Sequence, residues 1–405
     1  MLNEKGIREL AYVAKITDVR PIEGYDRVEL VVVNDGWTCV VGKGQFSKGD
    51  LAVYFEIDSK LPEKPPFSEN EFIVKKKYKI QTQKMCKSIS QGLIMSAEDF
   101  GGFQYQDGDG QFYIQIDGKS YKKGEFLTEI LGVTYAVKED NRRKGARGDN
   151  KYARMAKHHP KLAKTWIWGK IYKTSFGKKL LYSIFGKSEQ KRSDWPSWVK
   201  KTDEERIQNM TWILNNKEPW VVTEKIDGTS TTFTVHRHRH SKKYDFYVCS
   251  RNVVFDSDRT KCFYDENYYT KMAEKYNVQR ILTDFAKQFE YEWVTLQGET
   301  FGEGVQKRDY SLKGQEFFGF NLITNKEGRW NSIEAKNTMS RYGIHWVPIL
   351  DEAFILPDTL DEMLTYATGE SILDGGMREG VVLRSQDGTM SFKAVSNEYL
   401  LKFHS

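Results

Sequence analysis

The sequence predicts an α+β protein that begins with a small β-barrel and continues into a larger domain of helices and antiparallel sheets. Three observations lead to this expectation. The chain has 405 residues, and single hydrophobic cores rarely grow past about 250–300 residues, so two or three domains are expected. Its first third reads as short strands, and its second half mixes strands with helices. Aromatic residues make up 14% of the chain, which supplies enough bulk to fill several cores.

The barrel is expected over residues 1–130. Short runs rich in β-branched and aromatic residues alternate there with turn sequences, and no helical stretch is of comparable strength. The runs are 28–33, 37–41 and 51–57, and the turns are 34–36 and 48–50. This spacing is typical of a small closed barrel, a fold that often binds oligonucleotides. The alternative is a barrel that only packs against its neighbour.

Residues 131–201 form a basic segment that contains aromatic residues and is interpreted as a linker or a subdomain. Lys and Arg greatly outnumber Asp and Glu, as in 141–147 and 178–187. Basic groups can contact phosphates and aromatic faces can stack on bases, so the segment favours a nucleic-acid partner. The net charge of +6 points the same way. A solvated helical linker is the alternative.

Residues 202–405 are expected to form an α+β domain. Strand-like runs are separated by one long helical stretch, which is an α+β pattern. The expected strands are 221–223, 230–235, 244–249, 317–323 and 380–383, and the expected helix is 266–289.

The segment Glu224-Lys225-Ile226-Asp227-Gly228 is the strongest candidate for chemistry. A deprotonated lysine amine is a nucleophile. The carboxylate of Asp227, two residues on, could hold a hydrated metal ion, and glycine lets the backbone pass close to a bound group. Such a string alone is a modest signal.

Five further pieces follow in order along the chain. Each places a charged or aromatic residue in or beside an expected strand: Arg251, Glu299, Phe320 with its neighbour Phe318, Glu379, and Lys393. The six pieces together match, in order, the nucleotidyltransferase motifs of the covalent ligase and capping-enzyme superfamily. The stretches at 224–230 and 298–306 most closely resemble those of RNA ligases. A barrel placed in front resembles the Naegleria and Deinococcus type of RNA ligase, in which an OB domain precedes an ATP-grasp-like nucleotidyltransferase domain.

This resemblance implies an ATP-dependent RNA ligase that works through a covalent lysyl-AMP on Lys225. Glu379 and Asp227 would hold Mg²⁺ or Mn²⁺ largely through water, with Glu299 near the ribose or the same hydrated metal. Lys393 would contact the α-phosphate and help to depress the pKa of Lys225. The partner would be RNA with 3′-OH and 5′-phosphate ends, in RNA repair.

The resemblance also implies contacts with the nucleotide. Phe320 would stack on adenine, and Phe318 is the reserve candidate because period two puts it on the same strand face. Arg251 would reach the ribose or a phosphate, and Arg206, in the family-like stretch 201–209, is a further phosphate candidate. Glu224 could accept from the adenine amino group.

One departure concerns the last motif, where the family commonly has two lysines spaced K-x-K. Here Lys393 is flanked by Ser391 and Val395. We expect the second cation to come from elsewhere, such as Lys402 or Arg384, or the phosphate contacts to be weaker.

Composition excludes some classes of protein. No run of about 18 apolar residues and no signal-peptide pattern occurs, so no membrane association is expected. The four cysteines are widely spaced and not arranged as CxxC, which favours free thiols in a reducing, cytoplasmic setting. We expect a monomer.

Two alternatives remain: a DNA ligase or capping enzyme of the same superfamily, and a non-catalytic RNA-binding protein on a ligase scaffold.

Overall fold

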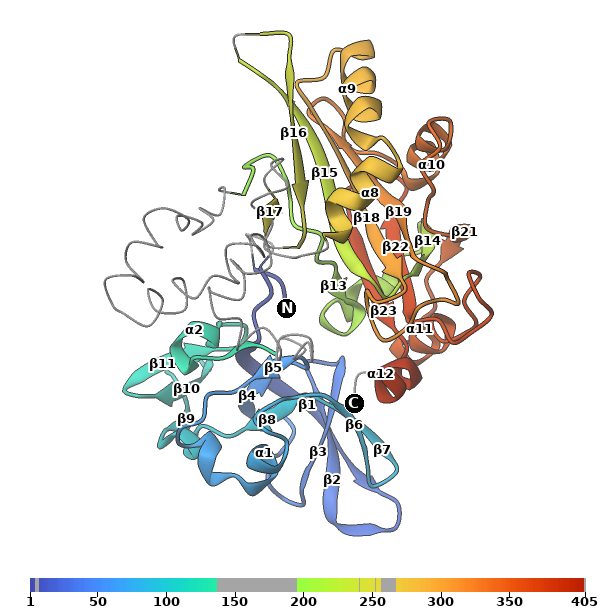
Figure 1. Ribbon diagram of the computed structural model, residues 1–405. Coiled ribbons are helices and arrows are strands. Elements are labelled where there is room, and N and C mark those ends of the chain that lie inside the picture. Colours follow the sequence, from blue (N-terminus) through green and yellow to red (C-terminus); the bar gives the residue numbers. More distant parts are fainter. Residues whose placement is uncertain (4–6, 137–194, 240, 252, 256–266, 404–405) are drawn as a thin grey trace, which may run out of the picture.

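The computed structural model describes residues 1–3, 7–136, 195–239, 241–251, 253–255 and 267–403. Two bodies lie one above the other, and the first residues of the chain lie between them (Figure 1). Most of the basic segment expected at 131–201 lies outside the described residues, so the interpretation of that segment stays a prediction.

The lower body contains the predicted barrel. Its main sheet has the order β3-β2-β1-β4-β8. The long strand β1 pairs with β4 through its first half and with β2 through its second, with a register shift after Ile16, so one strand serves both sides of the curved sheet. The strands are β1 (Ala11–Ile22), β2 (Tyr25–Val33), β3 (Trp37–Gly42), β4 (Leu51–Phe55) and β8 (Leu93–Met95), with the hairpin β6 (Thr82–Met85) and β7 (Ser88–Gln91).

Hydrogen bonds from β3 to β7 connect the far edge of this sheet to the hairpin. The Thr38 hydroxyl donates to the carbonyl of Ile89 at 2.8 Å, and the backbone N–H of Val40 donates to Ser90 Oγ at 3.2 Å. The same body carries a three-stranded sheet that packs Ile114 and Ile116 onto the barrel core. Its other elements are β5 (Ser59–Lys60), α1 (Glu71–Lys75), β9 (Phe103–Gln106), β10 (Phe112–Ile116), β11 (Lys119–Lys122), α2 (Thr128–Leu131) and β12 (Thr134–Tyr135).

The upper body contains two sheets. One has the order β17-β16-β15-β18-β19-β20 and the other β13-β23-β22-β14-β21. All of their pairings are antiparallel except that of β13 with β23, which is parallel. The strands are β13 (Glu205–Arg206), β14 (Pro219–Lys225), β15 (Thr229–Arg237), β16 (Tyr244–Cys249), β17 (Val254–Phe255), β18 (Trp293–Gly302), β19 (Gln315–Thr324), β20 (Gly328–Arg329), β21 (Ile349–Ile355), β22 (Gly380–Ser385) and β23 (Ser391–Val395). The predicted α+β fold with a leading barrel is confirmed.

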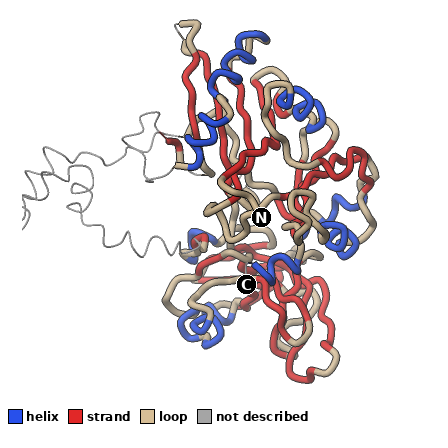
Figure 2. The backbone as a smooth tube through the Cα atoms, turned by 45° about the vertical axis from the view of Figure 1, so that its right-hand side comes forward, coloured by secondary structure: helices blue, strands red, loops and turns tan. Residues whose placement is uncertain are grey.

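Helices cover the outer faces of these sheets (Figures 1 and 2). The helix predicted at 266–289 is wrong as one element, because Asn277 adopts a left-handed conformation with φ 52° and separates α8 from α9. The helices are α8 (Tyr268–Lys275), α9 (Val278–Gln288), α10 (Ser332–Ser340), α11 (Leu360–Ala367) and α12 (Asn397–Phe403). Among the described helices, none combines the length and apolar character needed to cross a bilayer.

The two bodies contact each other at the end of β23 and at α12. Ile57 of the barrel forms a buried cluster with Val395 and Leu400. Gln91 of the barrel donates to the side chain of Asn397 at 3.0 Å. The strand that carries Lys393 therefore rests directly on the barrel.

Candidate active site

Lys225 is the last residue of β14, and its amine contacts Glu379. The preceding strand residues 220–223 are buried, which anchors the strand up to the point where Lys225 emerges. Lys225 pairs with Gly380 across the sheet, so Glu379 lies at the start of the neighbouring strand. Lys225 Nζ is 2.7 Å from Glu379 Oε2, and the two side chains are 25% and 8% exposed. The predicted nucleophile Lys225 and the predicted carboxylate Glu379 thus form a largely buried ion pair.

Gly228 brings the loop after Lys225 against the other sheet. A Cβ at this position would lie 2.4 Å from the carbonyl oxygen of Thr300 and 2.9 Å from Glu299 Cγ. Only glycine permits this close backbone approach. The residues around Lys225 and Glu299, which come from different sheets, are held next to each other for this reason.

Asp227 is buried and held by two tyrosines. Its Oδ2 accepts from the Tyr399 hydroxyl at 2.8 Å, and its backbone N–H donates to the Tyr310 hydroxyl at 2.7 Å. Burial raises the pKa of both phenols, and the nearby Asp227 and Glu379 carboxylates raise it further. Neither tyrosine could be predicted from the sequence, because neither belongs to a motif around Asp227.

The carboxylates keep the Lys225 amine charged. Burial opposes the charged form, but Glu379, Glu299 and Asp227 outweigh it and raise the pKa of Lys225 above its ordinary value. The expectation that cations depress this pKa is therefore wrong for the protein alone. Burial, together with Glu379 and Asp227, raises the pKa of Glu299 to about 8, against the opposing effect of Lys225. The site holds more negative charge than one ammonium can balance.

This excess of negative charge fits a divalent cation that carries water. Hard cations such as Mg²⁺ bind carboxylate oxygens and retain several water ligands. In the described part of the chain, no three His, Cys, Asp or Glu side chains lie close enough together to ligate a metal. Asp227, Glu299 and Glu379 therefore suit a metal ion that they bind through water rather than one that they coordinate directly.

Lys393 lies beside Arg206. The two residues pair across the parallel strands β13 and β23. Burial, followed by the charge of Arg206, lowers the pKa of Lys393 to about 7. Arg206 is 6% exposed, and burial together with Arg8 lowers its pKa. Arg206 thus occupies the neighbourhood in which a second cation was expected.

The two candidates named for that second cation lie elsewhere. Arg384 is 3% exposed and donates to Asn321 Oδ1 and to Thr223 Oγ1, each at 3.1 Å, so its donors tie β22 to β19 and β14. Lys402 is exposed on α12, over the ring of Phe403. Arg384 is therefore a structural cation, which corrects the expectation that it could supply the second phosphate contact.

Phe320 sits at an irregularity of β19. Gln297 pairs with Asn321 and Gly298 with Gly319, so Phe320 is the extra residue of a β-bulge, a feature that re-aims a side chain. The Arg384 guanidinium lies 5.6 Å from the centre of its ring. Phe317 is fully buried in the core. Phe318 pairs with Glu299 and packs edge-on against Phe301 with ring centres 5.0 Å apart.

Glu224 and Arg251 have protein partners. The Glu224 carboxylate is buried and accepts from the Ser371 hydroxyl and from the backbone N–H of Ile372, the latter at 2.9 Å. Arg251 forms an ion pair with Asp203, and its guanidinium lies 5.2 Å from the ring centre of Tyr135. Arg251 thus lies where the two bodies meet. The nucleotide contacts expected of both residues stay predictions.

Comparison with known proteins agrees with this arrangement. Residues 218–403 match the model of the RNA ligase family, and residues 10–97 match that of an OB-fold domain. The solved Naegleria gruberi RNA ligase with PPi shares 27% identity with a TM-score of 0.69, over 97% of this chain and 98% of that chain. A mutant of that ligase with ATP and Mn shares 26% with a TM-score of 0.72, over 98% and 100%. None of the curated proteins compared with the chain matches it significantly.

The fold is that of an RNA ligase, and residues 218–403 form an RNA ligase domain. Its barrel is an OB fold placed before the ligase domain. Over nearly its whole length the chain resembles the Naegleria gruberi RNA ligase, in which the same two domains occur in the same order.

Proposed function

We propose that this protein is an ATP-dependent RNA ligase that joins 3′-OH and 5′-phosphate ends through a lysyl-AMP intermediate on Lys225. The observation that carries the proposal is the contact of Lys225 with Glu379, beside Glu299 and Asp227 and on the same sheet as Lys393. An amine among carboxylates, with buried cations nearby, suits displacement at phosphorus, where positioning and charge neutralisation dominate. Solved Naegleria ligase structures with ATP or AMP and Mn support the choice of nucleotide and metal.

The reaction would run in three displacements. The Lys225 nitrogen, once it has lost its proton, bonds to the α-phosphorus of ATP, and the bond to pyrophosphate breaks. An oxygen of the RNA 5′-phosphate then displaces the lysine, which regains a proton, and leaves an adenylylated end. Finally the 3′-OH attacks that 5′-phosphorus, loses its proton and releases AMP.

The chain's own residues would prepare each displacement. Asp227, Glu299 and Glu379 would hold hydrated Mg²⁺ or Mn²⁺, which when bound would supply positive charge and favour the neutral amine. Lys393 would stabilise charge on the α-phosphate, with Arg206 beside it. Phe320, in its bulge above Arg384, would stack on adenine, while Glu224 and Arg251 would complete the nucleoside contacts. Phe318 is the reserve for stacking.

The test is covalent labelling. We expect the protein, incubated with α-³²P-ATP and Mg²⁺, to acquire a labelled adduct that Lys225→Ala does not form. A nicked duplex whose 3′-OH strand is RNA should then be sealed. RNA binding by the wild-type protein without an adduct from any nucleotide would favour a non-catalytic binding protein, and sealing of all-DNA nicks at the same rate would favour a DNA ligase.

The biological setting follows from these substrates. ATP and broken RNA with such ends are both found inside cells, so we propose a role in RNA repair in the cytoplasm. We propose that the protein acts as a monomer.

A further inference from the structure

Helix α12 follows the strand that carries Lys393 and contacts two carboxylate residues of the candidate site. Ser396, the residue before the helix, is fully buried, and its backbone N–H donates to the carbonyl oxygen of Glu379 at 2.9 Å. Its hydroxyl accepts from the backbone N–H of Tyr399 at 3.2 Å and so caps the helix. The Tyr399 hydroxyl in turn donates to Asp227 Oδ2. The first turn of α12 is therefore fixed against both Glu379 and Asp227.

Tyr399 has little freedom to move. It is 0% exposed, and its ring packs on that of Phe403 with ring centres 4.5 Å apart. The hydroxyl of Thr368, just after α11, donates to Ser396 Oγ at 3.2 Å and ties the start of the helix to α11. A phenol fixed in this way decides where the carboxylate that it contacts points.

Tyr310 fixes the backbone of Asp227 in the same manner. It lies in the segment after β18, is 3% exposed and packs edge-on against Phe301 with ring centres 5.3 Å apart. Its hydroxyl accepts from the backbone N–H of Asp227. The side chain and the backbone of Asp227 are thus held by different tyrosines, which come from different parts of the chain.

Arg308 connects Tyr310 to the segment that precedes Glu379. Its guanidinium lies 4.2 Å from the centre of the Tyr310 ring and forms an ion pair with Asp374. It also donates to the carbonyl of Met377, two residues before Glu379. Arg308 is 8% exposed, so these contacts are shielded from water. The contacts that support Asp227 therefore continue into those that support Glu379.

The site needs such supports because its carboxylates repel one another. Asp227 is 6% exposed, and the charges of Asp227 and Glu379 both act on Glu299. In a site with little water this repulsion is strong and favours turning the carboxylates apart. Hydrogen-bond donors behind the ligands of a metal ion fix the orientation of those ligands, and loss of one such donor commonly weakens metal binding 10- to 100-fold.

We propose that Tyr399 is a positioning residue for the divalent cation: its hydroxyl holds the Asp227 carboxylate against the repulsion of its neighbours and directs it toward the water shell of the ion. Tyr310 has the same role for the Asp227 backbone. The inference rests on the proposed function, in which Asp227 holds hydrated Mg²⁺ or Mn²⁺. Both tyrosines would act through Asp227 and would not touch the nucleotide or the reacting atoms.

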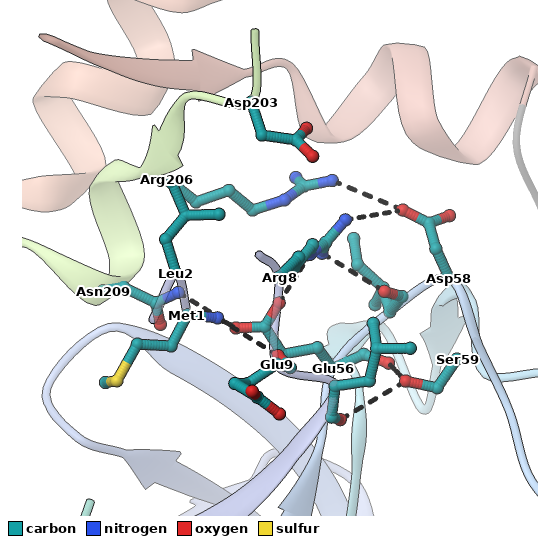
Figure 3. Close-up of polar contacts among 12 residues, drawn as sticks. Met1, Leu2, Arg8, Glu9, Glu56, Asp58, Ser59, Asp203, Arg206 and Asn209 are labelled. Atoms are coloured by element: carbon teal, nitrogen blue, oxygen red, sulfur yellow. Dashed lines mark hydrogen bonds and ion pairs between the residues drawn. The ribbon is translucent and has the colours of Figure 1, made fainter. Parts of the chain in front are cut away.

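The docking of the two bodies is supported independently of Tyr399. A separate network joins the barrel to the 3₁₀ turn at Ile207–Asn209 (Figure 3). Arg8 donates to Glu56 Oε2 at 2.8 Å, and Asn209 Nδ2 donates to the other oxygen of the same carboxylate at 3.0 Å. Removal of one hydroxyl from α12 should therefore leave the bodies in place and disturb Asp227.

The test compares Tyr399→Phe with Tyr244→Phe in the full chain, since each removes one phenolic hydroxyl and keeps the ring. The Tyr244 hydroxyl donates to the carbonyl of Tyr291 at 2.7 Å, and Tyr244 pairs with Arg237 at the end of β15 away from the site. Binding of Mn²⁺ in the presence of AMP is measured by electron paramagnetic resonance. We expect Tyr399→Phe to raise the dissociation constant of Mn²⁺ roughly tenfold and Tyr244→Phe to leave it unchanged.

Adenylylation of Lys225 gives a second measurement. The Mn²⁺ concentration for half-maximal adduct formation should rise by a similar factor in Tyr399→Phe, and the deficit in rate should shrink as Mn²⁺ is raised. A merely structural loss would instead lower the amount of active protein at every Mn²⁺ concentration. Tyr310→Phe, which removes the oxygen that accepts from the Asp227 N–H, should show the same dependence and keeps the test usable if Tyr399→Phe does not fold.

A double-mutant cycle with Asp227→Ala shows whether Tyr399 acts through Asp227. If it does, Tyr399→Phe adds nothing to the loss of Mn²⁺ affinity in Asp227→Ala. The inference is overturned if Tyr399→Phe binds Mn²⁺ like the wild type, if its effect persists without Asp227, or if the wild type forms the adduct but binds no Mn²⁺ with AMP. Absence of any adduct in the wild type would instead refute the proposed function.

Discussion

Arg206 and Lys393 lie side by side on parallel strands, although the first comes near the start of the ligase domain and the second near its end. A second lysine close to Lys393 in sequence is missing, and its place is taken by a cation that is close only in space. This pairing puts a half-buried positive charge next to a buried one. It also makes the ionisation of Lys393 sensitive to what binds there.

ATP binding should weaken above neutral pH. The pKa of Lys393 in the free protein is about 7, against an ordinary lysine value of about 10.4. Below pH 7 the ammonium is present, whereas above it the protein must take up a proton to bind phosphate. We expect the KM for ATP to be flat below pH 7 and to rise by up to about tenfold per pH unit above it. Adenylylation by Lys393→Arg, measured over pH 6–9, should lack this rise; an equal rise in both would contradict the assignment.

Lys393 should also cost stability. Because its pKa is depressed on folding, the half-buried ammonium destabilises the fold fully below pH 7, and this cost is relieved as pH rises from 7 toward the unfolded value. Lys393→Met should therefore raise the melting temperature at pH 6–7 by roughly 2–4 °C for each kcal/mol gained, while adenylylation is lost. The gain should shrink at pH 9. A variant that melts lower at pH 6 would show that the lysine stabilises the fold.

Loss of the Glu379 charge should impair lysine adenylylation. Glu379→Gln can still accept a hydrogen bond from Lys225 but cannot attract a cation. We expect the rate of adduct formation to fall by about 100-fold or more, as for other groups that stabilise charge during reaction. Glu362→Gln, in the exposed N-terminal turn of α11, is the matched control and should react normally. A Glu379→Gln rate close to that of the control would remove Glu379 from the site.

Substitutions of Phe320 and Phe318 in β19 should distinguish a side chain that binds the nucleotide from one that packs in the protein. Stacking on a base is worth about 1–3 kcal/mol, so Phe320→Ala should raise the KM for ATP roughly 5- to 100-fold, and Phe320→Tyr should restore it. Phe318 packs against Phe301, so Phe318→Ala should lower the melting temperature with a smaller change in KM. The opposite pattern in steady-state adenylylation would make Phe318 the stacking residue.

Glu56 should contribute to stability at neutral pH and lose that contribution in acid. Burial would raise its pKa, but Arg8, the Met1 amino group and Asn209 together lower it to about 2. The carboxylate is therefore stabilising above its unfolded pKa of about 4.3, and that stability is lost as pH falls toward 2. Glu56→Gln should cost roughly 2–3 kcal/mol at pH 7, about half of that at pH 3 and little at pH 2, by denaturant unfolding. A cost independent of pH would mean that packing, not charge, is lost.

Deletion of residues 1–130 tests the barrel as a whole. From the sequence we would expect such a truncation to adenylylate Lys225 normally and to fail in sealing.

What the sequence determined by itself was local. Strand runs, turns and the order of the motifs follow from side-chain periodicity and from residue types near each other in the chain, so the barrel, the α+β domain and Lys225 could be predicted. The break at Asn277 could not, because a left-handed residue between two helical stretches leaves the apolar period intact. Tertiary structure alone decided that Glu379 keeps Lys225 charged, that two distant tyrosines hold Asp227 and that Arg206 lies beside Lys393. Electrostatic environment and burial depend on which strands become neighbours, and no local pattern records that choice.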